Sequence, residues 1–261
     1  MIKLIASDID GTLVQEGTHE LNPELLDVIL KLRAKGIQFA AASGRQWISI
    51  ERLFDPIKEK IFYISDNGAY VGCHGRNLFL NTIERAEAME LIEAMKKIPG
   101  VEVMVGSADT AYMDTKDQEL LDWMINGYKF RIQQVEDVRE ITDDIIKVTA
   151  YRKSAIEEST RELCKQFGDR FKMSIAGDVW LDCMAKGVNK GAAIRVMQEE
   201  LGILPEETMA FGDQCNDIEM MKQAYYSFAV NNAKPEVKEA ARFRADSNDQ
   251  DGVLKILKLL L

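Results

Sequence analysis

The N-terminal segment constrains the fold of this chain most strongly. A mainly apolar segment, residues 2–7, leads directly into two carboxylates, Asp8 and Asp10, followed by Gly11 and Thr12. Such an abrupt ending is typical of a buried strand that opens into a functional turn. Because side chains two apart on a strand point to the same side, the two carboxylates should converge on one small volume. Like charges held that closely favour a bound divalent cation or unequal protonation.

Two plainer interpretations of this segment compete with a functional one. The first is a polar turn after a strand, and the second is part of a calcium loop. An EF-hand loop needs further oxygen ligands and a Glu at its twelfth position, and residues 15–18 do not supply that pattern. On this segment alone, a polar turn remains an open interpretation. The choice between a polar turn and a functional site therefore depends on which other residues of the chain lie near Asp8 and Asp10.

Composition limits the possible functions. With 261 residues the chain can form one large or two ordinary domains. Its net charge of −10 argues against a protein that binds nucleic acid or anionic membranes, because no basic stripe offsets the acidity. The four cysteines lack the spacing of a zinc site, and the chain has two histidines. We expect reduced thiols, no secretory signal, no membrane helix, and a cytoplasmic protein without an obligate protein partner.

The first 81 residues alternate between strand and helix patterns. Asn22 and Pro23 are typical of a helix start, and Gly36 ends the apolar periodicity of that helix. A second apolar strand over 37–42 ends in Ser43, and a third over 61–64 precedes a hairpin with its turn near 74–77. Strand, helix and strand in this order predict a parallel sheet whose crevice lies at the carboxyl ends of its strands.

The pattern changes near residue 82, where strands begin to come in groups. We expect a helix over 84–98, strands over 101–105 and 111–113, a helical stretch over 116–125, a strand over 145–151, a helix over 154–167, and strands over 171–175 and 179–184. Grouped strands predict a separate α+β unit.

From residue 187 the first pattern resumes. We expect a helix from 189, strands over 208–211 and 226–230, a helix over 235–241, and a final helix whose last leucines, 259–261, pack on the core. The predicted fold is therefore a doubly wound α/β core, residues 1–81 and 186–261, interrupted by an α+β domain, residues 82–185.

Polar residues follow several of the predicted core strands or begin a core helix. Carboxylates from Asp8 and Asp213 make a hard oxygen site that suits Mg2+. A lysine, a hydroxyl and backbone amides beside that ion would hold a phosphoryl group. Taken singly, each of these residues also fits a helix cap, a turn or an exposed surface. Their joint order favours one site, formed by Asp8, Asp10, Ser43, Lys190, Asp213, Asn216 and Asp217.

Four segments in this order resemble the motifs of the haloacid dehalogenase superfamily and, within it, the Cof-like phosphatases. They are residues 8–12, 42–45, 189–191 and 212–217, which read Asp-Ile-Asp-Gly-Thr, Ala-Ser-Gly-Arg, Asn-Lys-Gly and Gly-Asp-Gln-Cys-Asn-Asp. The resemblance spans nearly the whole chain. It implies a Rossmann-like core and makes the inserted domain a large α/β cap.

The resemblance also implies roles for the site residues. Asp8 would be the nucleophile that becomes an aspartyl phosphate, and Asp10 would be the general acid and base. The implied magnesium ligands are Asp8, the backbone carbonyl of Asp10, Asp213 and Asp217, with Asn216 completing or orienting the shell. The implied phosphate-binding residues are Ser43, Gly44, Lys190 and Asn216, and Asn67, Asn231 and Asn232 are further candidates to line the site.

The resulting prediction is a magnesium-dependent phosphatase of small phosphorylated metabolites. Sugar phosphates are the first expectation, followed by phosphorylated cofactors such as flavin mononucleotide or pyridoxal phosphate. Two alternatives stay open. One is a phosphosugar mutase, which shares the nucleophile and the metal. The other is a non-catalytic regulatory protein of the same fold, whose usual mark would be the loss of Asp8, Asp10 or Asp213, all of which are present.

Overall fold

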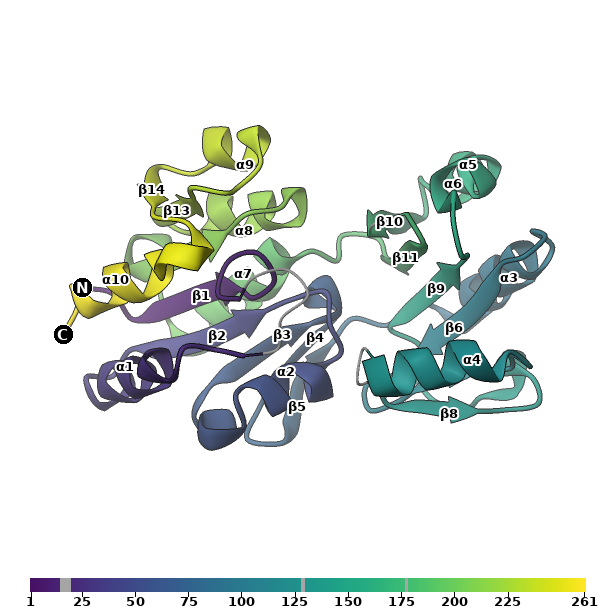
Figure 1. The fold of residues 1–261 in the computed structure, drawn as a ribbon, viewed down its shortest axis with the longest axis horizontal. Coiled ribbons are helices and arrows are strands. Elements are labelled where there is room, and N and C mark those ends of the chain that lie inside the picture. The colour runs from purple at the N-terminus through teal and green to yellow at the C-terminus, as the bar shows by residue number, and fades with distance from the viewer. Residues whose placement is uncertain (15–19, 128–129, 177) are drawn as a thin grey trace. The chain divides into compact units, whose positions relative to one another are not determined.

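Two compact units make up the chain (Figure 1). The structure is a computed structural model that describes residues 1–14, 20–127, 130–176 and 178–261, so residues 15–18 of the rejected calcium loop lie outside it. One unit combines Met1–Phe79 with Asn189–Leu261, and the other is Leu80–Val188. The first unit is thus built from both ends of the chain, and the second is an insertion.

The discontinuous unit is built on an eight-stranded sheet in the order β14-β13-β12-β1-β2-β3-β4-β5. Neighbouring strands from β14 to β3 run parallel, and β4 pairs antiparallel with β3. The turn of the expected hairpin, near 74–77, joins β4 to its sheet neighbour β5. The strands are β1 Leu4–Asp8, β2 Gln38–Ala42, β3 Phe62–Ser65, β4 Tyr70–Cys73, β5 Arg76–Leu80, β12 Thr208–Gly212, β13 Tyr226–Val230 and β14 Phe243–Ala245.

Helices connect these parallel strands. The side chain of Asn22 caps the first helix by accepting from the backbone N–H of Glu24, and Pro23 occupies its first position, as the sequence indicates. Leu25, Ile29 and Leu32 recur at helical spacing and are buried. The helices of this unit are α1 Pro23–Ala34, α2 Trp47–Leu53, α7 Lys190–Leu201, α8 Ile218–Gln223, α9 Pro235–Ala240 and α10 Gly252–Lys258.

The strand order reverses at β1, which lies between β2 and β12. From β1 the chain builds the sheet outward on one side through β2 and β3, and on the other side through β12, β13 and β14. This is the doubly wound α/β arrangement that the sequence predicts. In such sheets the ligand crevice lies at the carboxyl ends of the strands beside the reversal. All five residues of β1 and of β12 are buried, so both strands are rigid supports for the loops at their carboxyl ends.

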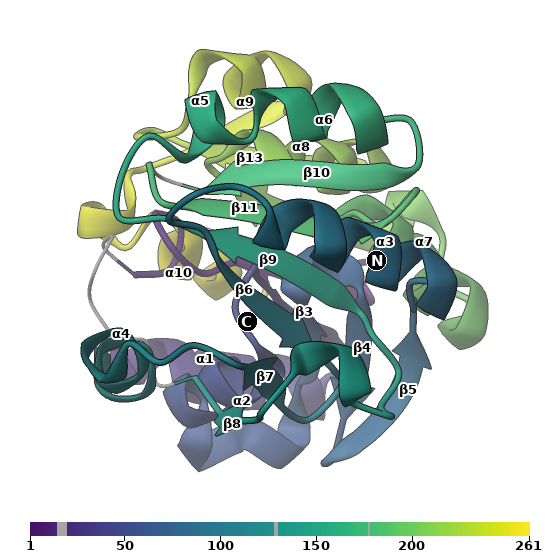
Figure 2. The same ribbon diagram turned by 90° about the vertical axis from the view of Figure 1, so that its right-hand side faces the viewer.

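The inserted unit is an α+β fold with a six-stranded sheet in the order β10-β11-β9-β6-β7-β8 (Figure 2). Its neighbours pair antiparallel except β7 and β8, which are parallel. The elements are α3 Arg85–Lys96, β6 Glu102–Gly106, β7 Ala111–Met113, α4 Gln118–Asp122, β8 Ile132–Gln134, β9 Lys147–Tyr151, α5 Ile156–Ser159, α6 Arg161–Phe167, β10 Phe171–Ala176 and β11 Trp180–Ala185.

Two expectations from the sequence are wrong in detail. The single helix expected over 154–167 is two helices, α5 and α6, which meet at Thr160. The hydroxyl of Thr160 donates to the carbonyl of Ile156 at 2.7 Å, a bond of the kind that bends helices. The last leucines do not all pack on the core, because Leu259 is 80% exposed although Leu257 is fully buried. Consecutive side chains of a helix cannot face the same side.

No helix in the described ranges is long and apolar enough to cross a bilayer.

Candidate active site

Three loops of the core unit meet at one edge of its sheet. Asp8 is the last residue of β1, Ser43 directly follows β2, and Asp213 directly follows β12. Since β1 lies between the other two strands and all three are parallel, the carboxyl ends of these strands are adjacent. The expected convergence of strand ends is therefore present in the fold.

Lys190 joins these loops from the start of α7. The side chain of Asn189 caps that helix by accepting from the backbone N–H of Ala192 at 2.8 Å. The ammonium of Lys190 is fully buried and donates to Oδ1 of Asp8 at 2.5 Å and to Oδ1 of Asp217 at 2.7 Å. Burial by itself would lower the pKa of Lys190, but the carboxylates of Asp217 and Asp8 raise it, so the ammonium stays charged. An exposed lysine at a helix start is therefore excluded for this position.

Three buried carboxylates form a compact acidic cluster. Oxygen atoms of Asp8, Asp213 and Asp217 lie within 4.8 Å of one another. Burial raises the pKa of Asp8 well above its usual range, and the neighbouring carboxylate of Asp217 raises it further. Burial also raises the pKa of Asp213, although hydrogen bonds from Thr12 and Gln214 oppose this. Three carboxylates face one ammonium, an imbalance that a single divalent cation would neutralise.

The donors of this cluster fit magnesium. They are carboxylate oxygens, with no sulfur or imidazole nitrogen among them, and hard oxygen donors are what Mg2+ prefers. The second oxygen of Asp217 is already committed, because it accepts from the backbone N–H groups of Asp213 and Gln214 at 2.9 and 3.0 Å. Asp217 therefore also fixes the turn that carries Asp213.

The turn after β1 approaches Asp213 closely. Gly11 has a φ of +82°, and a Cβ atom there would lie 2.5 Å from Oδ2 of Asp213. The hydroxyl of Thr12 donates to Oδ1 of Asp213 at 2.8 Å. From the other side, the amide of Asn232 donates to the carbonyl of Gly11 at 2.7 Å. Only glycine fits this position without displacing the Asp213 carboxylate.

Asp10 stands apart from the acidic cluster as a side chain. Its carboxylate accepts from Arg45, through Nε at 2.9 Å and Nη2 at 2.5 Å, and remains 37% exposed. A bidentate guanidinium pair fixes the plane of a carboxylate as well as its position. The two acids of the first motif are thus held by different cations, Asp8 by Lys190 and Asp10 by Arg45.

Most of the remaining predicted residues lie in or beside the loop after β2, and Asn231 and Asn232 follow β13. The hydroxyl of Ser43 is buried and accepts from the backbone N–H of Arg45 at 3.1 Å. The amide of Asn216 donates to Oδ1 of Asn67 at 3.0 Å, and a Cβ atom on Gly44 would lie 3.3 Å from the Asn67 amide. Asn232 holds Gly11, and Asn231 is exposed. The structure thus brings Asn67 together with Gly44 and Asn216.

Sequence reasoning assigned no role to Arg45 and no partner to Asn67. The sequence could have indicated a role for Arg45, because a cation two residues beyond Ser43 lies near several predicted acids. For Asn67 the sequence indicates less, because Asn-Gly after a strand predicts only a turn. Its contact with Asn216 spans 149 positions and depends on the sheet order.

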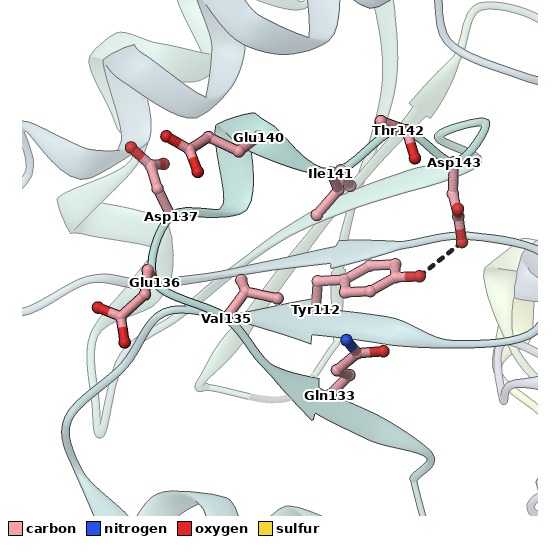
Figure 3. A pocket seen from close by; sticks show the side chains of 9 residues that line it. All are labelled: Tyr112, Gln133, Val135, Glu136, Asp137, Glu140, Ile141, Thr142 and Asp143. Atoms are coloured by element: carbon pink, nitrogen blue, oxygen red, sulfur yellow. Dashed lines mark hydrogen bonds between the residues drawn. The ribbon is translucent and has the colours of Figure 1, made fainter.

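A pocket of about 250 Å3 lies in the inserted unit (Figure 3). Four carboxylates line it, from Glu136, Asp137, Glu140 and Asp143, and the hydroxyl of Tyr112 donates to Asp143 at 2.5 Å. Hydrogen bonds from Arg139 lower the pKa of Asp137 to about 2, so this group is ionised at neutral pH. No lysine or arginine is among the described residues that line this pocket, whereas Lys190 and Arg45 pair with carboxylates of the core site. The core site is therefore the better candidate for phosphoryl chemistry.

Comparisons with known proteins agree with this geometry. A profile of haloacid dehalogenase-like hydrolases matches residues 5–257. The 5-amino-6-(5-phospho-D-ribitylamino)uracil phosphatase YbjI of Escherichia coli (strain K12) is 30% identical over 100% of this chain and 96% of its own length. A crystal structure of a protein from Eubacterium rectale covers 100% of this chain and 99% of its own, at 34% identity and a TM-score of 0.94. The structure of the HAD subclass IIB sugar phosphatase BT4131 covers 99% of this chain and 98% of its own, at 26% identity and a TM-score of 0.82.

Proposed function

The chain belongs to the haloacid dehalogenase-like hydrolase family and is a phosphomonoester hydrolase, and on that premise we propose a magnesium-dependent reaction on small phosphorylated metabolites that passes through an aspartyl phosphate. One observation carries this proposal most directly. A buried carboxylate at a strand end, Asp8, accepts from a buried ammonium and lies within 4.8 Å of two further buried carboxylates. Such a group is held rigidly for attack on a phosphoryl group.

In the proposed first step an oxygen of Asp8 attacks phosphorus and the ester oxygen leaves. Asp10 gives its proton to that leaving oxygen and so becomes a carboxylate. In the second step Asp10 takes a proton from water, which attacks the aspartyl phosphate and releases phosphate and free Asp8. The proton returns to Asp10, so the cycle closes with one water consumed.

The other residues of the site bind and orient the phosphoryl group. Lys190 offers a positive charge, Ser43 a hydroxyl, Gly44 a backbone amide and Asn216 a side-chain amide. Magnesium would be held by Asp8, Asp213, Asp217 and the carbonyl of Asp10, and it would supply charge neutralisation for the transferred phosphoryl group. The acidic cluster supports this assignment through its oxygen donors and its unbalanced negative charge.

Sugar phosphates are our first substrate class. YbjI is named for a substrate with a phosphorylated ribityl group, and BT4131 is named a sugar phosphatase. We also propose that the inserted domain, which the sequence places at 82–185, acts as the cap that the family resemblance implies.

The test is the release of inorganic phosphate from a pool of small phosphate esters. Wild-type protein should release phosphate with magnesium and not with a chelator, and Asp8→Asn should lose at least about a thousandfold in rate. Asp27→Asn, which changes an exposed acid on α1, is the matched control and should keep full activity. An isomerised sugar phosphate in place of free phosphate would identify a mutase. Full activity of Asp8→Asn would reject the nucleophile, and a wild type inactive on the whole pool would reject the proposed hydrolysis.

A further inference from the structure

The turn after β3 has an unusual backbone. Three consecutive residues have positive φ: Asp66 at 48°, Asn67 at 56° and Gly68 at 102°. For residues with a side chain this conformation is strained, and such strain persists where the surrounding structure determines it, often at functional sites. The contacts of this turn therefore bear on the function of the loops around it.

Backbone hydrogen bonds tie the turn to the loop after β2. The N–H of Asn67 donates to the carbonyl of Ser43 at 3.0 Å, and the N–H of Asp66 donates to the carbonyl of Arg45 at 3.0 Å. Both donors belong to left-handed residues of the turn. The path of the Ser43–Arg45 segment is thus fixed by the turn.

The same turn reaches the start of α7. A Cβ atom on Gly68 would lie 2.4 Å from the carbonyl oxygen of Asn189, the residue that caps the helix of Lys190. Glycine at position 68 lets the two backbones approach this closely.

The side chain of Asn67 makes the third connection. Its Oδ1 accepts from Nδ2 of Asn216, and its amide lies against Gly44. A primary amide has two N–H donors. One donor of Asn216 is committed to Asn67, which fixes the plane of the Asn216 amide and leaves the second donor with a defined direction.

We propose that Asn67 is a positioning residue for phosphoryl binding, which acts through Asn216 by its side chain and through the Ser43–Arg45 segment by its backbone. This inference rests on the proposed function, in which Ser43, Gly44 and Asn216 bind the phosphoryl group. Asn67 aligns donors from the loop after β2 with a donor from the loop after β12, and it does so without being a metal ligand or a nucleophile.

The decisive variant is Asn67→Gly, because glycine keeps the left-handed backbone and removes the side-chain amide together with the acceptor for Asn216. We expect KM for a sugar phosphate and the inhibition constant of inorganic phosphate each to rise about threefold to tenfold, which corresponds to one lost hydrogen bond. The Tm of Asn67→Gly should not fall below the Tm of a control variant with glycine at another left-handed position. His74→Gly is that control, since His74 is an exposed left-handed residue in the β4–β5 turn, with φ of 55°.

A double-mutant cycle tests whether Asn67 acts through Asn216. Asn216→Ala and the double variant Asn67→Gly/Asn216→Ala should raise both constants to similar levels. Once the Asn216 amide is absent, the loss of the Asn67 acceptor breaks no further hydrogen bond. Additive effects in this cycle, or an Asn67→Gly protein with the constants of wild type, would overturn the proposal.

Calorimetric titration with inorganic phosphate separates this inference from the proposed function. A wild-type protein that binds phosphate and hydrolyses no ester in the pool, with calorimetric dissociation constants of the variants that follow the expected cycle, would overturn the proposed reaction alone. A wild type that hydrolyses esters while phosphate affinity is unchanged in Asn67→Gly would overturn the positioning role alone. A wild type that binds no phosphate would overturn the positioning role.

Discussion

The guanidinium of Arg45 holds both carboxylate oxygens of Asp10, from Nε at 2.9 Å and from Nη2 at 2.5 Å. The first motif therefore presents two acids with separate cationic partners. This pairing gives the exposed Asp10 carboxylate one orientation. When Asp10 carries the proton for the leaving oxygen, one of the two hydrogen bonds from Arg45 must give way, and the other keeps the carboxyl in place.

Replacement of Arg45 should affect esters with poor leaving groups most. We expect Arg45→Ala to lower kcat for a sugar phosphate at least about tenfold, since a freely rotating carboxyl loses its alignment. Arg45→Lys should lie between wild type and Arg45→Ala, because lysine keeps the charge without the bidentate fork. With p-nitrophenyl phosphate, whose leaving group departs without a proton, the loss should be smaller. Equal losses on both esters would show that Arg45 does not act on proton delivery.

Gly11→Ala and Gly36→Ala form a matched pair. Both glycines have similar φ, +82° and +84°, but only at position 11 would the new Cβ meet the Asp213 carboxylate. We expect Gly36→Ala to cost about 1 kcal/mol of unfolding free energy in urea, from backbone strain alone. Gly11→Ala should cost more and should also raise the magnesium concentration needed for half-maximal activity. A Gly11→Ala protein with the magnesium requirement of wild type would mean that Asp213 moves aside without consequence.

Lys190→Met should destabilise the protein strongly in the presence of a chelator. The change leaves the carboxylates of Asp8 and Asp217 buried without their shared cation, and breaking a buried pair costs about 3–5 kcal/mol. Adding Asp8→Asn to this variant should restore part of the loss, because it removes one of the unpaired charges. Urea unfolding of the three proteins measures this. A loss below about 1 kcal/mol in Lys190→Met would contradict the buried pairing.

Cys183 should make the unfolding free energy depend on pH in alkaline solution. Burial in the core of the inserted unit, with smaller effects from Asp182 and Cys164, raises the pKa of its thiol well above the usual value. The unfolded chain therefore loses this proton from about pH 8.5 upward while the native chain keeps it, and stability falls by up to about 1.4 kcal/mol per pH unit. Below that pH the contribution of the thiol is fully present. Cys183→Ala should show a shallower fall between about pH 8.5 and 10 in urea unfolding, and parallel curves would refute this.

The parts of the fold that the sequence predicts are those with long local patterns. The strand before Asp8 and the helix from Pro23 are predictable because apolar periodicity, capping and turn residues agree there. The short strands β8 and β14 were not predicted, because Ile-Gln-Gln and Phe-Arg-Ala form no apolar run. The equally short β7, Ala-Tyr-Met, is apolar and was predicted. Of the leucines at 259–261, Leu260 packs against the core as expected, but Leu259 and Leu261 are exposed, because a leucine count says nothing about which side of a helix each one faces.

The candidate site divides in the same way. Asp8, Asp213, Asp217 and Lys190 could be placed near one another because each lies at or just beyond the end of a predicted strand or begins the helix beside one. The pairing of Asp10 with Arg45 and of Asn67 with Asn216 depends on side-chain directions and on which strands become neighbours. Those contacts are set by tertiary packing, which no local window contains.

The position of β1 in the sheet has a consequence for biosynthesis. One partner of β1, the strand β2, is synthesised soon after it. The other partner, β12, begins at Thr208, about 200 residues later. At ~5–20 residues per second, the ribosome takes roughly 10 to 40 s to reach that point. During this interval the strand that carries Asp8 has one open hydrogen-bonding edge, which is a template for aggregation. The nascent N-terminal segment, including the strand of the proposed nucleophile, is therefore the part of the chain with most need of chaperone protection while the insertion is being made.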